Sequence, residues 1–377
     1  MNSSKIANYV GFLILFLGIY ACSKRDQKQT IFIEPGINNI SCSASEILND
    51  IKVVHLETNP NCLIGYFSSL IFMDDKNIIF LSNKTIIVFD NQGKFLSKID
   101  ALGRGPEEYV SIVNAFADPI ERKIYIVDYE DIKIFSFGGE YIKTLKLPSS
   151  AGGVYRRNNG QMIVVCKQVY KNENRDMMYM LDSSLKIYHT FKSKNSDVCK
   201  DIQQNLFFAG TPYEIDGRLF YVEPFVDTIY EIEATQLITH WTINMGNLGF
   251  KTEDGINTNN FEKASNKIPP LGLQETKNYF FINYTYKNAE YRSLYDKTLN
   301  KSIFHQKYTR EDFPEGSIPV YGIKNDLIKN SPLFWPDYSN GNILVGLIDP
   351  TSLSENQLKS FGSKLDDNTI LFVGILK

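Results

Sequence analysis

Residues 77–96 read NIIFLSNKTIIVFDNQGKFL, and residues 123–142 read KIYIVDYEDIKIFSFGGEYI. Each stretch holds two short runs rich in Ile, Val, Phe and Tyr, then a turn with Gly and a third apolar run. Phe89 and Phe135 occupy matching places, 46 residues apart. Short β-branched and aromatic runs between Gly, Asn and Asp are typical of antiparallel strands. Repeats of about 40 to 50 residues are typical of β-propeller blades.

The same pattern continues, more loosely, to the end of the chain, and no segment after the first 25 residues keeps the 3.6-residue period of a helix. Several runs are apolar at consecutive positions, as expected for strands covered on both faces by neighbouring sheets. We therefore predict an all-β fold, a six-bladed β-propeller over residues 51–377, although seven shorter blades also fit the length. The six predicted units are 63–100, 103–148, 151–195, 205–247, 272–310 and 323–377.

Two segments lie outside these units. The run Ile51 to Glu57 (IKVVHLE) precedes the first unit and is well placed to complete the last blade. Such closure by an N-terminal strand would remove the exposed edge of an open ring. Residues 248–271 are polar, contain Pro269-Pro270, and are predicted to form a long insertion between two blades.

The first residues have the features of an export signal. Lys5 precedes an apolar run of 11 residues, 10–20, which is too short to span a bilayer, since spanning takes about 20 residues. Ile19-Tyr20-Ala21-Cys22 resembles the lipobox at which bacterial lipoproteins are lipidated on cysteine and cleaved, although Tyr20 is larger than is usual there. We predict a lipoprotein signal peptide over 1–21 and lipidation at Cys22. An ordinary signal peptide or an uncleaved anchor is the alternative.

Residues 22–50 are then expected to be a leader that begins with a polar tether. The membrane is a predicted partner, reached through the lipid on Cys22. The expected location is the cell envelope, with the lipid in the outer membrane. The protein then lies on either the periplasmic or the surface side of that membrane.

Charge and cysteine spacing exclude several other classes of protein. The net charge is −3 and the pI about 5.9, without a basic block, which argues against a nucleic-acid partner. No CxxC or Cys/His cluster indicates zinc, and we predict neither a metal nor a cofactor. The cysteines other than Cys22 are either paired in disulfides or buried as free thiols: Cys42, Cys62, Cys166 and Cys199.

Residues 51–148 resemble a known family. The motifs are Val54-His55-Leu56-Glu57-Thr58, Gly103-Arg104-Gly105-Pro106-Glu107-Glu108-Tyr109, and Ile124-Tyr125-Ile126-Val127-Asp128. They are similar to those of the six-bladed β-propeller lipoproteins of Bacteroides and its relatives. The resemblance implies the fold and an exported location, and it implies no activity.

Two stretches are candidates for contact with a ligand. The 103–109 motif either shapes the crossover between the first two blades or carries ligand contacts at Arg104, Glu107 and Tyr109, since Arg suits carboxylate or phosphate and Tyr suits a sugar or peptide. The aromatic stretch 334–338 (FWPDY) either lines a pocket at the rim or packs in the core.

No catalytic motif such as G-x-S-x-G or H-E-x-x-H is present, so no catalytic residue is predicted. The sequence favours a binding or scaffold module for a peptide, glycan or protein partner over an enzyme. The alternative is a metal-dependent hydrolase or lactonase of the six-bladed type. It requires several Asp, Glu, Asn or His side chains that converge in the central channel.

Overall fold

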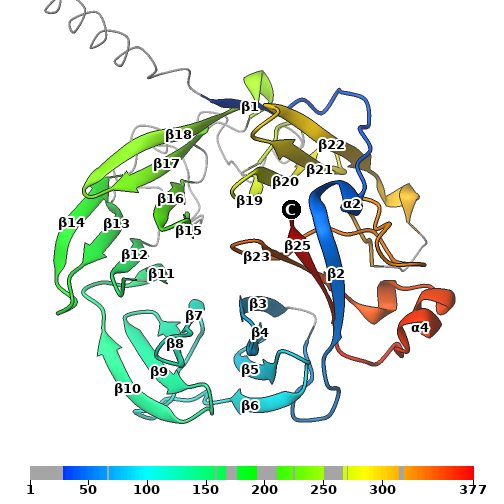
Figure 1. Ribbon diagram of the computed structural model, residues 1–377. Coiled ribbons are helices and arrows are strands. Elements are labelled where there is room, and N and C mark those ends of the chain that lie inside the picture. The colour runs from blue at the N-terminus through cyan, green and yellow to red at the C-terminus, as the bar shows by residue number, and fades with distance from the viewer. Residues whose placement is uncertain are drawn as a thin grey trace, which may run out of the picture.

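The computed structural model describes residues 29–65, 68–157, 159–166, 176–192, 210–223, 226–249, 266–269, 271–313 and 318–377. Six sheets surround a common centre, and consecutive sheets follow the chain around the ring (Figure 1). The prediction of a six-bladed β-propeller is therefore confirmed. The predicted signal peptide, Cys22, Cys199 and most of the 248–271 insertion lie outside the described residues.

The first three blades each contain four antiparallel strands. Blade one comprises β3 (Ser68–Met73), β4 (Asn77–Ser82), β5 (Thr85–Asp90) and β6 (Phe95–Ile99). Blade two comprises β7 (Asn114–Asp118), β8 (Lys123–Asp128), β9 (Asp131–Ser136) and β10 (Tyr141–Lys146). Blade three comprises β11 (Ala151–Arg156), β12 (Met162–Cys166), β13 (Asp176–Leu181) and β14 (Ile187–Lys192).

Two of the other three blades, four and six, include a strand from the N-terminal part of the chain. Blade four comprises β15 (Thr211–Ile215), β16 (Arg218–Val222), β17 (Thr228–Glu233), β18 (Gln236–Asn244) and, at its outer edge, β1 (Thr30–Phe32). Blade five comprises β19 (Gly272–Glu275), β20 (Tyr279–Tyr286), β21 (Ala289–Asp296) and β22 (Lys301–Tyr308). Blade six comprises β23 (Tyr338–Asn340), β24 (Ile343–Ile348), β25 (Ile370–Leu376) and β2 (Leu48–His55).

The ring closes in blade six. β2 pairs antiparallel with β25 over its whole length, with Lys52 opposite Val373, so strands from both ends of the chain share one sheet. This confirms the predicted closing strand. The paired residues begin a few positions earlier than expected.

The leader follows the outside of the ring from residue 29 onward. β1 adds a parallel strand to β18 of blade four. Ile40 then exchanges two backbone hydrogen bonds with His305 of blade five, at 2.8 and 3.0 Å. The chain reaches blade six through the short helix α2 (Ala44–Ile47) and β2. Residues 30–55 thus contact the outer edges of three consecutive blades.

Apolar layers between neighbouring blades form the core. Ile79 and Val88 of blade one pack with Ile124 and Ile126 of blade two, and all four are fully buried. This explains the consecutive apolar positions, since each inner strand is covered by a blade on either side. Within the described residues, no helix is long and apolar enough to cross a membrane. Cys42, Cys62 and Cys166 are buried free thiols.

Candidate functional site

A cavity of about 1150 Å³ lies at the centre of the ring. Its wall includes residues from the innermost strand of every blade, for example Phe72, Phe116, Tyr155, Tyr213, Gln274 and Tyr338. Hairpin turns of blades four, five and six surround one mouth, at Asp216–Gly217, Lys277–Asn278 and Gly341–Asn342. A concave site of this size with both aromatic and polar walls suits a small molecule or a short chain segment.

Tyrosine hydroxyls hold several aromatic walls of the cavity in place. Tyr338 accepts a hydrogen bond from the backbone N of Met73 at 3.3 Å, which links blade six to blade one. Tyr155 donates to Oε2 of Glu214 at 3.4 Å, which links blades three and four. Burial raises the pKa of Tyr338 to about 12. These rings are therefore neutral at physiological pH and offer apolar faces beside polar groups.

Asp337 presents a carboxylate to the cavity. The residue directly precedes β23, lines the cavity, and keeps an exposed surface there. Oδ2 accepts a hydrogen bond from the backbone N of Leu347 at 2.7 Å. Protein nevertheless surrounds the group closely, and this burial raises the pKa of Asp337 to about 6, against the hydrogen bond from Leu347, which lowers it. A carboxyl group with a raised pKa in a cavity is a frequent mark of a functional site.

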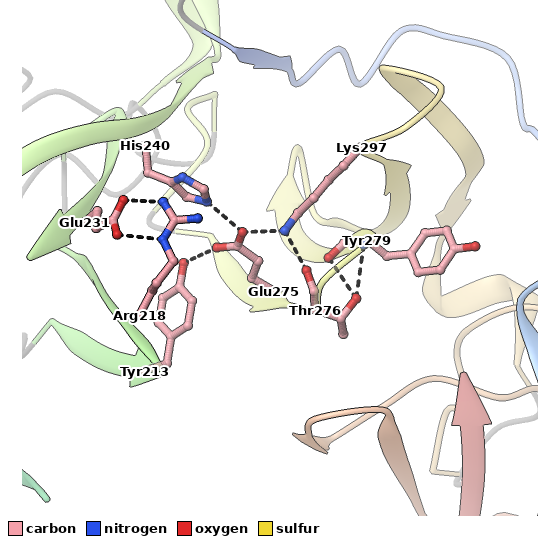
Figure 2. A network of polar contacts seen from close by, with 8 residues as sticks. All are labelled: Tyr213, Arg218, Glu231, His240, Glu275, Thr276, Tyr279 and Lys297. Carbon is pink, nitrogen blue, oxygen red and sulfur yellow. Dashed lines mark hydrogen bonds and ion pairs between the residues drawn. The ribbon is translucent and has the colours of Figure 1, made fainter. Parts of the chain in front are cut away.

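A buried ion cluster forms the wall between blades four and five (Figure 2). Glu275 of β19 lies at its centre, with a side chain that is 1% exposed. Oε2 accepts from the hydroxyl of Tyr213 at 2.5 Å, and Oε1 contacts Nε2 of His240 at 2.9 Å and Nζ of Lys297 at 2.5 Å. Lys297 also donates to the carbonyl oxygen of Thr276. Burial alone would raise the pKa of Glu275, but the hydrogen bond from His240 and the charge of Lys297 outweigh it and lower this pKa.

A second pair completes the cluster on the blade-four side. The guanidinium of Arg218 donates through Nε to Oε1 of Glu231 at 2.7 Å, and through a second nitrogen to Oε2. This contact raises the pKa of Arg218, and it lowers that of Glu231. Two carboxylates thus face two basic side chains, Lys297 and Arg218, so the cluster is compensated internally. Its geometry fits a structural link between blades better than a site that awaits a charged ligand.

The structure places the residues predicted at the 103–109 motif outside the cavity wall. Arg104 and Glu107 are exposed in the crossover between blades one and two. Tyr109 is 0% exposed, and its hydroxyl donates to the carbonyl oxygen of Lys84 at 2.7 Å. Burial raises its pKa to about 12. Tyr109 is therefore a packing residue that cannot reach a ligand at the rim, and this part of the prediction needs correction.

The loop itself is shaped by contacts to its backbone. Glu108 accepts a hydrogen bond from the backbone N of Gly105 at 2.7 Å, and Lys133 donates to the carbonyl oxygen of Pro106 at 2.8 Å. The loop thus shapes the crossover between blades one and two, which is one of the two roles predicted for it. Contact of a ligand with Arg104 or Glu107 stays a prediction.

The aromatic stretch 334–338 takes both of its predicted roles. Phe334 and Trp335 are 1% and 8% exposed and pack in the core, where Trp335 donates to Oδ1 of Asn283 at 2.7 Å. Asp337 and Tyr338 line the cavity instead. No local pattern indicates which of these residues turn inward. The Glu275 cluster has no sequence signal either, because its members are scattered from 213 to 297.

The described ranges contain no group of three or more His, Cys, Asp or Glu side chains that could hold a metal ion. Both oxygens of Glu275 in the cavity wall already contact other side chains, those of Tyr213, His240 and Lys297. The residues on the cavity wall therefore offer hydrogen bonds and charge to a ligand.

Comparison with known proteins identifies the fold. A Bacteroides fragilis protein assigned as exported aligns over 93% of this chain and 99% of its own, with a TM-score of 0.64 and 18% identity. A protein of unknown function from Bacteroides caccae aligns over 66% of this chain and 81% of its own, with a TM-score of 0.36 and 10% identity. The first similarity shows a shared fold, and the second is too weak to carry an argument. No curated protein matches the sequence.

A family described as a domain of unknown function, DUF4934, matches residues 28–374, which is nearly the whole chain. The resemblance to Bacteroides propeller proteins that the first third of the sequence carries is consistent with this match and with the shared fold. The match begins just before β1 and ends within β25, so it includes all six blades. The protein therefore belongs to the DUF4934 family.

Proposed function

We propose that this protein is exported, is held in the cell envelope by a lipid on Cys22, and acts as a binding module whose central cavity receives its ligand. The ligand is a peptide, a glycan or a segment of a protein. The observation that carries the proposal is the cavity of about 1150 Å³, whose wall is built by all six blades and combines tyrosine rings with hydrogen-bonding side chains from blades three to six.

The cavity is a better binding site than the exposed 103–109 loop. A concave site buries most of a ligand's surface, whereas a loop on a convex surface contacts it on one side only. The cavity wall is also rigid, because it is built from strands that inter-blade hydrogen bonds hold in place, such as those of Tyr338 and Tyr155. Rigid walls reduce the entropy lost on binding. Nothing in the described residues specifically favours the hydrolase alternative.

A substitution that narrows the cavity tests the proposal. Ser339 of β23 lies in the cavity wall, and Ser339→Trp places a large ring there. Peptide and oligosaccharide panels are screened against the mature protein by the rise in melting temperature. We expect ligands that stabilise the wild type to lose about tenfold or more in affinity for Ser339→Trp, because the ring occupies their site. Ala117→Trp, from blade two, repeats the test if the first variant is unstable.

Glu130→Trp is the matched control, since Glu130 is exposed on a turn of blade two outside the cavity wall. It adds the same ring and is expected to bind as the wild type does. Ligands that bind both cavity variants with wild-type affinity would place the site elsewhere on the protein and overturn the proposal.

The lipid anchor has its own test. Cys22→Ser removes the thiol that would be acylated, so the variant should remain unprocessed and leave the membrane fraction. Immunoblots of fractionated cells, washed at high salt, measure this. A Cys22→Ser variant that still sediments with membranes as the wild type does would contradict the anchor.

A further inference from the structure

The two carboxylate oxygens of Asp337 differ: Oδ2 accepts a hydrogen bond, and Oδ1 has no donor among the described residues. β23 begins only at Tyr338, so Leu347 of β24, which pairs with Leu371 of β25 on one side, has no strand partner on the β23 side. Oδ2 of Asp337 accepts from its backbone N instead, at 2.7 Å. Among the described residues, nothing donates to Oδ1. One carboxylate oxygen in the cavity wall is therefore available to a ligand.

Within the described ranges, the charge of Asp337 is also not balanced by an ion pair. No Lys, Arg or His in the described ranges forms an ion pair with Asp337. The one cation whose charge affects its pKa is Arg292. That guanidinium is engaged elsewhere, since it donates to Oε2 of Glu290 at 3.1 Å and to the carbonyl oxygen of Tyr291 at 3.0 Å. Glu275, by contrast, holds Lys297 and His240 directly. Asp337 is thus an uncompensated carboxylate, and Glu275 is a compensated one.

The other unpaired acceptor on a residue of the cavity wall is closed off from a ligand. Oε1 of Gln274, on the innermost strand of blade five, has no hydrogen-bond partner within the described part of the chain, but the atom itself is buried. Oδ1 of Asp337 is therefore the acceptor that a ligand can reach. Ammonium and guanidinium groups carry only donors, three and five respectively. They are the groups that match a spare acceptor that is also an anion.

The aromatic wall is compatible with the same chemistry. Tyr155 and Tyr338 line the cavity with neutral rings, and a cation over the face of a tyrosine ring is attracted by the quadrupole of the ring. We propose that the cavity binds a ligand through a cationic ammonium or guanidinium group, with Asp337 as its counter-ion. This inference rests on the proposed function of the cavity and names the chemical class of its ligand.

The pH dependence follows from the raised pKa of Asp337, about 6. Above this value the carboxylate is charged and attracts the cation. As the pH falls through about 6, protonation removes the charge, so affinity for the cation falls. The groups that act on Asp337 are the backbone N of Leu347 and the charge of Arg292, and Arg292 keeps its charge throughout this range.

Trilysine is the probe for the experiment, and its Nε-acetylated form is the matched neutral peptide. Calorimetric titration of the mature protein compares them at about pH 7.5 and about pH 5. We expect trilysine to bind the wild type at the higher pH and to bind it more weakly at the lower pH. At the higher pH its affinity should exceed that of the acetylated peptide. Asp337→Asn keeps an acceptor for Leu347 and removes only the charge, so it should fold and lose about tenfold or more in affinity. Glu130→Gln, an exposed carboxylate outside the cavity wall, controls for general attraction to an acidic protein.

Three results would overturn the inference: wild-type protein that does not bind trilysine, equal binding of the two peptides, or Asp337→Asn that binds as Glu130→Gln does. Each of these leaves the Ser339→Trp test of the cavity unaffected, so a cavity that takes an uncharged ligand is distinguished from a cavity that takes none.

Discussion

Lys297 and Glu275 form an ion pair that is almost removed from water, with side chains 14% and 1% exposed. Burial lowers the pKa of Lys297, and the charge of Glu275 opposes this shift. The pair joins the inner strand of blade five to a hairpin turn of the same blade, and Tyr213 and His240 extend it to blade four. Removal of one charge from such a pair leaves the other buried and unpaired, which is costly.

We therefore predict that Lys297→Met lowers the free energy of unfolding by about 3 kcal/mol, as measured by urea denaturation. The double variant Lys297→Met/Glu275→Gln should recover a large part of this loss, because no charge is then left unpaired. Because the folded-state pKa of Glu275 lies below its ordinary value, the stability it contributes is present at neutral pH and is lost as the pH falls through that lowered pKa.

Lys146→Met is the matched control for this prediction. Lys146 pairs with Asp131 at 2.5 Å, but its side chain is 79% exposed. Exposed pairs are screened by water and add little to stability, so this variant should unfold nearly as the wild type does. Equal losses in Lys297→Met and Lys146→Met would show that the cluster does not hold blades four and five together.

At the same scale, the sequence predicted the candidate site only in part. The stretch 334–338 could be identified because three aromatic residues and a proline within five positions are unusual, but which of them face the cavity depends on where β23 begins. Only their chemical types indicate Arg104, Glu107 and Tyr109, whereas the burial of Tyr109 depends on the apolar layer between blades one and two and on its hydrogen bond to the carbonyl oxygen of Lys84. A local pattern does not contain that long-range contact.

The repeat at the level of elements was visible in the sequence because each blade requires the same local chemistry. Gly93 and Gly139 end equivalent hairpins at φ +85° and +90°, in the left-handed region that favours glycine. A Cβ at Gly93 would lie 2.0 Å from the carbonyl oxygen of His55 on β2, so this turn packs tightly against the closing strand. Apolar runs and turn residues are local signals, and they predict the ends of blades one and two within two residues, at Ile99 and Lys146. The predicted starts, 63 and 103, lie before β3 and β7 because the units include the segments that lead into each blade.

No local signal in the sequence predicts β1. It has three residues and forms a strand only because β18 offers a free outer edge, more than 200 residues away in the chain. The two-bond contact of Ile40 with His305 depends on blade five in the same way. Elements that exist through one long-range partner leave no periodicity in the sequence.

At the scale of the whole molecule, the leader and the closing strand make one continuous support on the outside of the ring. Residues 30–55 pass along blades four, five and six, and β2 joins the two ends of the chain in one sheet (Figure 1). A ring closed in this way cannot widen without breaking strand pairing. The central cavity therefore keeps a fixed shape, which suits selective binding by a rigid site.

The claim that the ligand occupies the central cavity is tested most directly by photo-crosslinking in living cells. A benzophenone side chain is placed at Asn342, in a turn at one mouth of the cavity, or at Arg104, in the exposed crossover loop. Irradiation followed by mass spectrometry of the purified protein detects any adduct. We predict an adduct from position 342 that Ser339→Trp abolishes, and none from position 104. An adduct from position 104 alone would contradict the claim and place the site on the rim.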